Sequence, residues 1–247
     1  MDVLQGREVV AAVHLTDQVE GYCSIIIPVL NEADTIVHYL ELLQYYRQAG
    51  HELILVDGGS QDNTVNLAET YVDRLVITTI KGRAHQMNQG AQYATGKVLL
   101  FLHADTCLPE DACNTVLASM AQMGRQWGRF NVILTGQHIF FRVIERMINM
   151  RSALTGIATG DQAMFINRTL FQALGGFPVQ PLMEDIEMST RLKKVCQPVC
   201  LKSRVTTSSR RWEENGIVKT VFLMWRLRFA YFLGVSPRRL VKQYYVS

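Results

Sequence analysis

The sequence predicts an α/β fold: a mostly parallel sheet flanked by helices, followed by a less regular half and a C-terminal helical tail. Apolar, β-branched runs occur four times in the first half of the chain. A helix-compatible segment separates each run from the next, and polar residues follow three of them. Strands that alternate with helices form parallel sheets covered on both faces.

The first strand is expected over residues 24–30, where a run rich in isoleucine and valine ends at Asn31-Glu32. Apolar residues then recur at helical spacing over residues 36–46, and Gly50 is suited to end that helix. This strand and helix are the first repeat of the expected alternation.

The second strand is expected over residues 52–57 and ends in an acid, Asp57. The Gly58-Gly59-Ser60 turn follows, and Ser60 is expected to cap a helix that runs to about Tyr71. A third strand over 74–78 completes the next repeat.

A helix over about residues 83–94 leads into the fourth strand, 97–102, after which the chain presents His103-Ala104-Asp105. Pro109 suits the first turn of the next helix, which Gly124 is expected to end.

The second half is less regular. We expect strands over 129–135 and 163–166, helices over 138–154 and 184–195, and a strand or loop from Val199 onward.

Polar residues are expected together on one rim of the sheet, because ligands bind beyond the carboxyl ends of parallel strands. Asn31, Glu32, Asp57 and Asp105 are distant in sequence, yet each follows or ends a predicted strand. The alternative is that these residues simply mark turns. Three strand ends with the same pattern favour a ligand site.

Composition indicates a globular protein of one main domain. The 247 residues are 48% hydrophobic and carry a net charge of only +3, which does not suggest a protein that coats nucleic acid. Five cysteines without paired spacing fit neither a disulfide framework nor a zinc site, so we expect reduced thiols in the cytoplasm. No secretory signal or membrane-spanning segment is expected.

The ordered motifs resemble those of the family-2 glycosyltransferases, which have the GT-A fold. Ile27–Glu32 and Val56–Thr64 are similar to the family's two nucleotide-binding loops. Gly82-Arg83 with Asn88, Gly90 and Ala91 matches the helix before the metal motif, and Leu102–Asp105 stands where the family carries its DXD sequence. The resemblance covers about residues 24–212.

The resemblance implies a nucleotide-sugar donor site and a divalent cation. A cation can stabilise the charge that develops on a departing diphosphate, and Mn²⁺ or Mg²⁺ accepts the hard oxygen ligand that Asp105 offers. His103 replaces the first acid of the motif, and contact with ribose or phosphate is its alternative role. The implied donor-binding residues are Pro28, Leu30, Asn31, Glu32, Asp57, Gly58, Gly59, Arg83, His103, Ala104 and Asp105.

The same resemblance implies an acceptor side. Gly175-Gly176-Phe177 followed by Glu184-Asp185 is similar to the family segment whose aspartate serves as base. Asp185 is therefore expected to be the general base of an inverting displacement, with Glu184 orienting the acceptor. Without the resemblance, these acids would be read as ordinary helix capping. Gly160, Asp161 and Gln162 are expected to contact acceptor hydroxyls.

Arg210-Arg211-Trp212 partly matches the QxxRW motif of processive members, but Ser208 stands in place of the glutamine. A processive polymerase is therefore not inferred.

The expected domains are an N-terminal extension (1–22), a glycosyltransferase domain (23–212) and a tail (213–247). The domain divides into a nucleotide-binding half, about 23–125, and an acceptor half, about 126–212. The tail mixes basic and aromatic residues, which is typical of a helix lying on an anionic membrane at its inner, cytoplasmic face. Packing on the catalytic domain or on a second subunit is the equal alternative.

The function predicted is metal-dependent inverting transfer of a sugar from a nucleoside diphosphate sugar to a hydroxyl of a saccharide, lipid or small-molecule acceptor. A nucleotidyltransferase and a non-enzymatic sugar-nucleotide-binding protein are the alternatives. The chain lacks the glycine-rich basic loop that a nucleotidyltransferase usually carries early in its sequence, which disfavours the first alternative. Retention of Asp105 and Asp185 disfavours the second.

Overall fold

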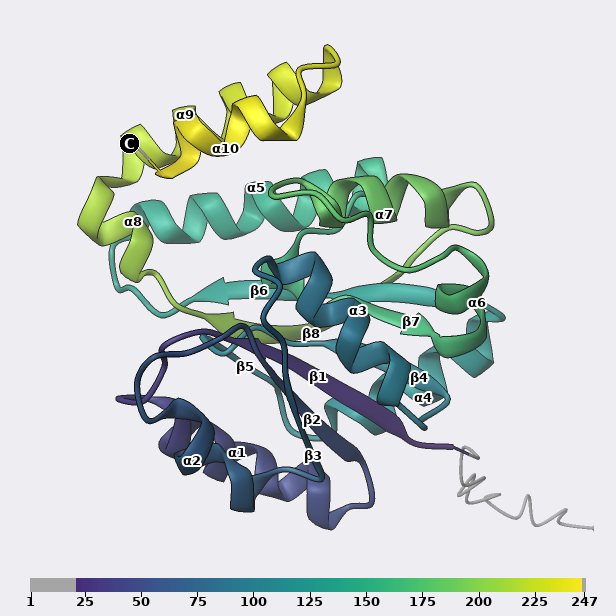
Figure 1. The fold of residues 1–247 in the computed structure, drawn as a ribbon. Coiled ribbons are helices and arrows are strands. Elements are labelled where there is room, and N and C mark those ends of the chain that lie inside the picture. The colour runs from purple at the N-terminus through teal and green to yellow at the C-terminus, as the bar shows by residue number, and fades with distance from the viewer. Residues whose placement is uncertain (1–20, 246–247) are drawn as a thin grey trace, which may run out of the picture.

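A computed structural model describes residues 21–245, in which an eight-stranded sheet has the order β3-β2-β1-β4-β7-β6-β8-β5 (Figure 1). The N-terminal extension predicted for residues 1–22 lies almost wholly outside the described residues. The strands are β1 Cys23–Val29, β2 Glu52–Asp57, β3 Arg74–Ile77, β4 Val98–Phe101, β5 Thr106–Cys107, β6 Trp127–Leu134, β7 Phe165–Asn167 and β8 Val199–Thr207.

Ten α-helices and two short 3₁₀ helices lie between or after these strands in the described part of the chain. The α-helices are α1 Ile36–Gln48, α2 Thr64–Ala68, α3 Arg83–Tyr93, α4 Ala112–Met123, α5 Ile139–Thr155, α6 Arg168–Ala173, α7 Glu184–Lys193, α8 Arg210–Asn215, α9 Ile217–Phe232 and α10 Pro237–Tyr245. The 3₁₀ helices are η1 Glu69–Tyr71 and η2 Gly160–Gln162.

The predicted parallel arrangement of the first four strands is confirmed. β1 pairs in parallel with both β2 and β4, and β2 pairs in parallel with β3. The register places Val29 opposite Asp57, so the loops after β1 and β2 begin side by side. Strand β7 then joins β4 in the antiparallel direction, which is where the regular alternation ends.

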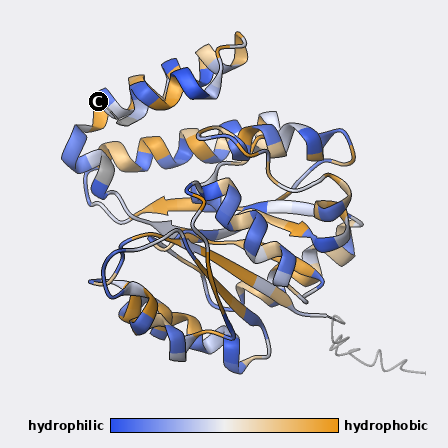
Figure 2. Cartoon of the chain, in the orientation of Figure 1, coloured by the Kyte–Doolittle hydropathy of each residue, from blue (hydrophilic) through white to orange (hydrophobic). Residues whose placement is uncertain are grey.

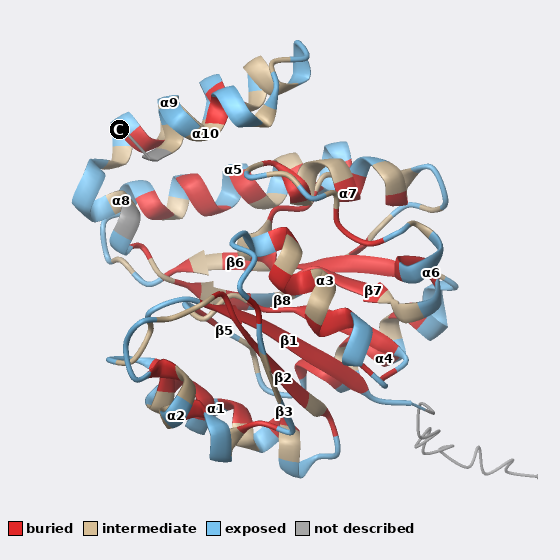
Figure 3. Ribbon diagram, in the orientation of Figure 1, coloured by how far each residue is buried: buried red, intermediate tan, exposed pale blue. Residues whose placement is uncertain are grey.

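Two apolar clusters cover opposite faces of the sheet, as the near-continuous apolar runs predict. Ile25 and Ile27 of β1 belong to the cluster that includes residues of α1, α4 and α5. Ile26 belongs to the cluster with α3, α6 and α7. Figure 3 shows the strands as the most deeply buried layer of the molecule. A Cβ at Gly90 of α3 would lie 2.5 Å from Ile26 Cγ2, so this glycine allows the helix to pack closely on β1.

The helix predicted to start at Ser60 begins instead at Thr64. The Ser60 hydroxyl is occupied by the neighbouring loops, where it accepts a hydrogen bond from Asn31 N–H and bonds to the Asp57 carboxylate. The Asp62 side chain accepts from Thr64 N–H, which moves the helix start past Ser60. The predicted cap therefore joins the two loops instead.

Other boundaries shift by a few residues. Helix α4 begins at Ala112 and not at Pro109, because the Ala112 N–H donates to the Pro109 carbonyl oxygen in a turn that precedes the helix. Gly124 ends the helix, as predicted, and has a left-handed conformation. The short strand predicted over 163–166 lies at Phe165–Asn167.

The tail is helical as predicted, and it forms a layer above α5 and α7 (Figure 1). Leu227 of α9 and Leu240 of α10 are fully buried together with Met183, which precedes α7. Within residues 21–245, every helix is too short or too polar to cross a bilayer.

Candidate functional site

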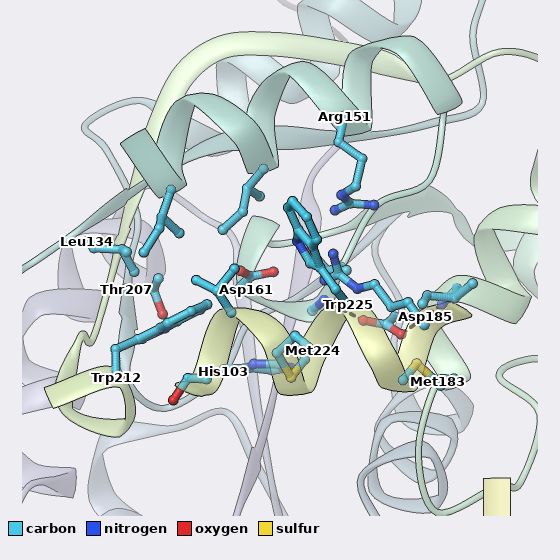
Figure 4. Close-up of a pocket in the computed structure, with 18 of the residues that line it drawn as sticks. His103, Leu134, Arg151, Asp161, Met183, Asp185, Thr207, Trp212, Met224 and Trp225 are labelled. Carbon is cyan, nitrogen blue, oxygen red and sulfur yellow. Dashed lines mark hydrogen bonds between the residues drawn. The ribbon is translucent and has the colours of Figure 1, made fainter. Parts of the chain in front are cut away.

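A cavity of about 460 Å³ lies where the β4–β5 loop, η2, the start of α7 and the tail helix α9 meet (Figure 4). This volume is within the usual range for a small-molecule site. The cavity gathers residues far apart in sequence, and the predicted site residues that line it are Arg83, His103, Asp105, Gly160, Asp161, Glu184 and Asp185.

Contacts from both sides fix the loop that carries His103 and Asp105. The Tyr39 hydroxyl of α1 lies 2.8 Å from the carbonyl oxygen of His103 and 3.1 Å from that of Thr106. From the opposite direction, Ser208 N–H donates to the Asp105 carbonyl oxygen at 3.1 Å. The loop is thereby held between α1 and the end of β8.

Asp105 presents an exposed carboxylate to the cavity, and the Thr106 hydroxyl donates to its Oδ1 at 3.2 Å. Further lone pairs of this carboxylate remain available to a cation. His103 contributes a neutral ring, because burial and the charge of Arg83 hold its pKa well below the usual value. This donor set fits Mn²⁺ or Mg²⁺ held by one carboxylate and completed by phosphate oxygens and water.

Asp185 lies in the first turn of α7, which begins directly after Met183, a residue with a left-handed φ of 68°. The backbone N–H of Gly160 donates to its Oδ2 at 2.9 Å, and the N–H of Ile186 donates to its Oδ1 at 2.7 Å. Burial raises the pKa of the Asp185 carboxyl, while these hydrogen bonds oppose that shift. The carboxylate is thus held rigidly at the cavity wall and retains lone pairs for a further donor.

Glu184 lies beside it and is only 8% exposed. Burial, together with the neighbouring charge of Asp185, raises the pKa of Glu184 to about 7. Two adjacent carboxyl groups with displaced pKa values in a cavity are typical of functional sites. Near neutral pH one of the pair therefore carries a proton much of the time.

The 3₁₀ helix η2 places its three predicted acceptor-binding residues differently. Gly160 and Asp161 line the cavity, and Asp161 Oδ1 is buried with no hydrogen-bond partner among the described residues. Gln162 does not line the cavity. Its side chain is fully buried, and its amide donates to the Phe130 carbonyl oxygen at 3.4 Å, so the structure gives it a role inside the protein.

The predicted nucleotide-binding loops after β1 and β2 contact each other outside this cavity. Asn31 Oδ1 accepts from Gln61 N–H, and Asn31 N–H donates to Ser60, so the loops are joined twice. Asp57 is 1% exposed, and its carboxylate accepts from the N–H groups of Gly59 and Ser60. The structure therefore shows Asp57 organising its own loop, and contact with a base remains a prediction.

The other residues predicted in these loops differ in exposure. Pro28 is buried within β1, whereas Leu30 is exposed at its end. Glu32 N–H donates to the Thr64 hydroxyl. Gly58 packs on the Gln86 side chain. Ala104 packs against the core between the two cavity residues of its loop.

Sequence reasoning missed Gln86 and did not assign the role that Asn88 has on α3. The Gln86 amide donates to the carbonyl oxygens of Val29 and Val56, and so joins the ends of β1 and β2. Asn88 exchanges two hydrogen bonds with the backbone of Phe177, each 2.8 Å long. Gln86 is buried among apolar residues on the inner face of α3, and a buried polar residue in such a position points to a hydrogen-bonding role.

Two arginines that sequence reasoning also missed line the cavity, Arg228 on α9 and Arg151 on α5. Figure 4 shows Arg151. Nε and Nη2 of Arg151, and Nε of Arg228, are buried with no partner among the described residues. Burial and the charge of Arg228 lower the pKa of Arg151 to about 10. Both arginines lie close enough to Asp185 to interact electrostatically with it.

The cavity has an apolar wall. This wall consists of side chains from α5, α8 and α9 and from the segment before α7: Ile144, Met147, Ile148, Met150, Leu182, Met183, Trp212, Val221, Met224 and Trp225. Trp212 of the partial QxxRW match reaches the cavity, as does Ser208, which replaces the glutamine. The side chain of Arg211 lies outside the described part of the structure.

A separate cluster of metal-ligand types lies at the opposite end of β1. Potential ligand atoms of Cys23, His51 and Cys113 are within 4.8 Å of one another, and all three residues are buried. Spacing along the chain gave no indication of this group. Thiol and imidazole ligands do not suit Mg²⁺ or Mn²⁺, so this cluster is distinct from the cation site predicted at Asp105.

Comparison with known proteins identifies related sequences. A family model described as Glycosyl transferase family 2 matches residues 24–169, more than half of the chain. A PGL/p-HBAD biosynthesis glycosyltransferase of Mycobacterium bovis is 42% identical over 93 residues, which are 35% of this chain and 36% of that protein. The poly-beta-1,6-N-acetyl-D-glucosamine synthase of Staphylococcus epidermidis is 22% identical over 71% of this chain and 46% of its own.

Solved structures share the fold. A mannosyltransferase from Pyrobaculum calidifontis, in complex with GDP-Man and Mn²⁺, has a TM-score of 0.60 at 22% identity and covers 85% of this chain and 61% of its own. S. aureus TarS in complex with UDP has a TM-score of 0.64 at 15% identity, over 76% of this chain and 60% of its own. The match to the mycobacterial relative spans about a third of that protein's length.

Proposed function

Because the chain belongs to glycosyl transferase family 2 and has its GT-A fold, we propose that it transfers a sugar, with inversion, from a nucleoside diphosphate sugar to an acceptor hydroxyl. One observation carries the proposal. A single cavity presents Arg83 and Asp105, which suit a diphosphate, together with Asp185, which suits an acceptor hydroxyl.

The donor end is assigned to Arg83, His103 and Asp105. The guanidinium of Arg83 matches phosphate oxygens, and the neutral ring of His103 can exchange hydrogen bonds with ribose or phosphate. Nucleotide or nucleotide-sugar complexes of the two structural relatives, with GDP-Man and with UDP, support a ligand of this class.

Asp105 would hold the divalent cation. When bound there, Mn²⁺ or Mg²⁺ would supply Lewis acidity that stabilises the negative charge on the diphosphate as it leaves. The Mn²⁺ bound in the Pyrobaculum complex supports a cation of this kind.

Asp185 is assigned as the general base. Its carboxylate removes the proton of the acceptor hydroxyl while the acceptor oxygen forms a bond to the anomeric carbon and the bond from that carbon to the diphosphate breaks. The hydrogen bonds from Gly160 and Ile186 aim the carboxylate. Glu184 orients the acceptor or its neighbours, and Asp161 offers a buried oxygen that lacks a partner among the described residues.

Family membership argues against the nucleotidyltransferase alternative. A non-enzymatic nucleotide-sugar-binding protein is the second candidate, because His103 occupies the position of an acid in the metal motif. The two candidates differ in turnover and not in donor binding.

A screen of nucleotide-sugars by thermal shift, with and without Mn²⁺ or Mg²⁺, tests the donor assignment, since a ligand that binds only the native state raises its melting temperature. The donor so identified is then incubated with candidate acceptors, and NMR reads the anomeric configuration of the product. Inverted product supports the proposal. Retained configuration would exclude the assigned mechanism, and donor binding without transfer to any acceptor would favour the second candidate.

A further inference from the structure

Helix α9 has an exposed apolar stripe along one face. Its members recur at spacings of three and four residues, which places them on one side of a helix. All are between 52% and 85% exposed: Val218, Phe222, Trp225, Phe229 and Phe232. The opposite face of the helix already packs, through Leu227, on Met183 and α10. The stripe is therefore additional to the contacts that hold α9 in place.

Helix α5 has a second stripe of the same kind. Its members are between 37% and 80% exposed and again follow helical spacing: Ile139, Val143, Met147, Met150 and Leu154. Figure 2 shows apolar residues along both helices, and Figure 3 shows that much of α9 is exposed. Exposed apolar stripes of this length mark interaction surfaces.

The two stripes meet at the catalytic cavity. Met147 and Met150 from α5 and Trp225 from α9 belong to the stripes and also line the cavity. The apolar surface is thus continuous with the apolar wall of the cavity that contains Asp185. We call the two stripes together the apolar rim.

Charge indicates what covers the rim. Residues 217–245 include six lysines and arginines and no acidic residue. A symmetric contact with a second copy would bring two such basic segments together, which like-charge repulsion opposes. An anionic lipid surface complements both the charge and the exposed aromatic side chains.

We propose that the apolar rim docks on an anionic bilayer, so that the cavity opens toward lipid and receives an acceptor embedded in the membrane. The acceptor hydroxyl would reach Asp185 while an attached apolar chain lies along the methionines of α5. The part of the proposal that concerns the acceptor rests on the proposed glycosyl transfer. Docking itself does not, and binding to vesicles is measured without any reaction.

The test is cosedimentation of the full chain with vesicles of phosphatidylglycerol and phosphatidylcholine, compared with phosphatidylcholine alone. Binding should require the anionic lipid and weaken as salt rises. Replacing Phe222, Phe229 and Phe232 together by serine should reduce binding by about tenfold or more. None of the three lines the cavity, and all are exposed, so the fold should be retained.

A matched control replaces exposed apolar residues away from the rim, Leu42, Val179 and Val195, by serine. It should bind vesicles like the wild type. For charge, Arg238, Arg239 and Lys242 are changed to glutamine. Because each basic residue near an anionic surface contributes about fivefold, binding should fall by about a hundredfold. The same changes at Lys194, Lys202 and Arg204, which are exposed elsewhere, should have little effect.

Light scattering gives the oligomeric state in the same buffer. No vesicle binding at low salt would overturn the proposal. Equal vesicle binding by the rim and control variants would also overturn it. A dimer that does not bind vesicles, and that the rim substitutions dissociate, would show instead that the rim is an interface between two copies. Vesicle binding together with failure of glycosyl transfer would refute the proposed function and leave the docking surface in place.

Discussion

The backbone N–H of Gly160 donates a hydrogen bond to Asp185 Oδ2 across 2.9 Å. The same glycine faces the metal-motif loop, because a Cβ at this position would lie 2.4 Å from Cε1 of His103. Gly160 therefore connects the loop that carries His103 to the proposed base. Any side chain at residue 160 would push these two parts of the site apart.

Gly160→Ala should lower the free energy of unfolding by about 1–3 kcal/mol, the usual effect of forcing an extra carbon into a packed site, and it should reduce transfer. Urea denaturation measures the first effect. A double-mutant cycle identifies the cause, since His103→Ala removes the ring that the new methyl group meets. The cost of Gly160→Ala should then be smaller in the His103→Ala background, and an unchanged cost would show that the ring is not the obstacle.

The pKa of Glu184 predicts a pH-dependent stability. Because its folded pKa is about 7 and its ordinary value is 4.5, folding favours the protonated carboxyl. This contribution is fully present below pH 4.5 and is lost as the pH rises through 7. Glu184→Gln does not titrate, so at pH 8 it should be more stable than the wild type, by up to about 3 kcal/mol. The difference should disappear in acid, and equal stability at pH 8 would argue against a raised pKa.

Asn88 holds the glycine-rich segment before α7. Its side chain makes two hydrogen bonds with the Phe177 backbone, so Asn88→Ala should leave a donor and an acceptor without partners at a cost of about 1–3 kcal/mol. Asn66→Ala is the control, because Asn66 is exposed and bonds only locally, and it should change stability by less than about 0.5 kcal/mol. Similar values for the two variants would contradict the structural role given to Asn88.

The regular half of the fold could be predicted from the sequence because burial on both faces requires continuous apolar strands. β1 and β2 have this pattern, and their ends place Asn31 beside Asp57 and its loop. The position of Ser60 could not be predicted in the same way. A serine before a helix is a good cap, and only the neighbouring loop, which brings Asn31 into contact, decides that its hydroxyl bonds there instead.

The candidate site was only partly predictable. Motif order indicated Asp105 and Asp185 but not Arg151 or Arg228, since long side chains on amphipathic helices look like solvated surface residues in a sequence. The two arginines meet at the cavity because α9 lies above α5 (Figure 1), and no local sequence pattern specifies that arrangement. Gln162 is the opposite case, a residue predicted at the site that lies away from the cavity. It was expected to contact the acceptor together with Gly160 and Asp161, but its side chain is buried and bonds to the Phe130 carbonyl oxygen.

Asp105 should make nucleotide binding depend on metal. Nucleoside diphosphates are expected to bind more tightly with Mn²⁺ or Mg²⁺ than with a chelator, because the carboxylate and the diphosphate oxygens can share the cation. Isothermal titration measures this difference. Asp105→Ala should remove the metal dependence, whereas His103→Ala should reduce it less. Equal affinity of the wild type in metal and in chelator would exclude the proposed role of Asp105.

Asp185→Asn tests the base most directly. The amide keeps the size of the side chain and an oxygen that can accept from Gly160, but it cannot take a proton. Donor binding should therefore survive within a few-fold, whereas transfer should fall by roughly 10²–10⁴, the usual contribution of a positioned base. Saturation binding and single-turnover kinetics measure the two effects separately.

Glu184→Gln is the matched control for that variant, because the neighbouring residue is also a buried carboxyl group with a raised pKa. If Glu184 only orients the acceptor, its amide variant should keep much more activity than Asp185→Asn. Its loss should appear mainly in KM, since orientation affects binding as well as chemistry. Near-normal turnover of Asp185→Asn with loss in Glu184→Gln would make Glu184 the base. If neither substitution reduced transfer, the acceptor site at the start of α7 would be wrong.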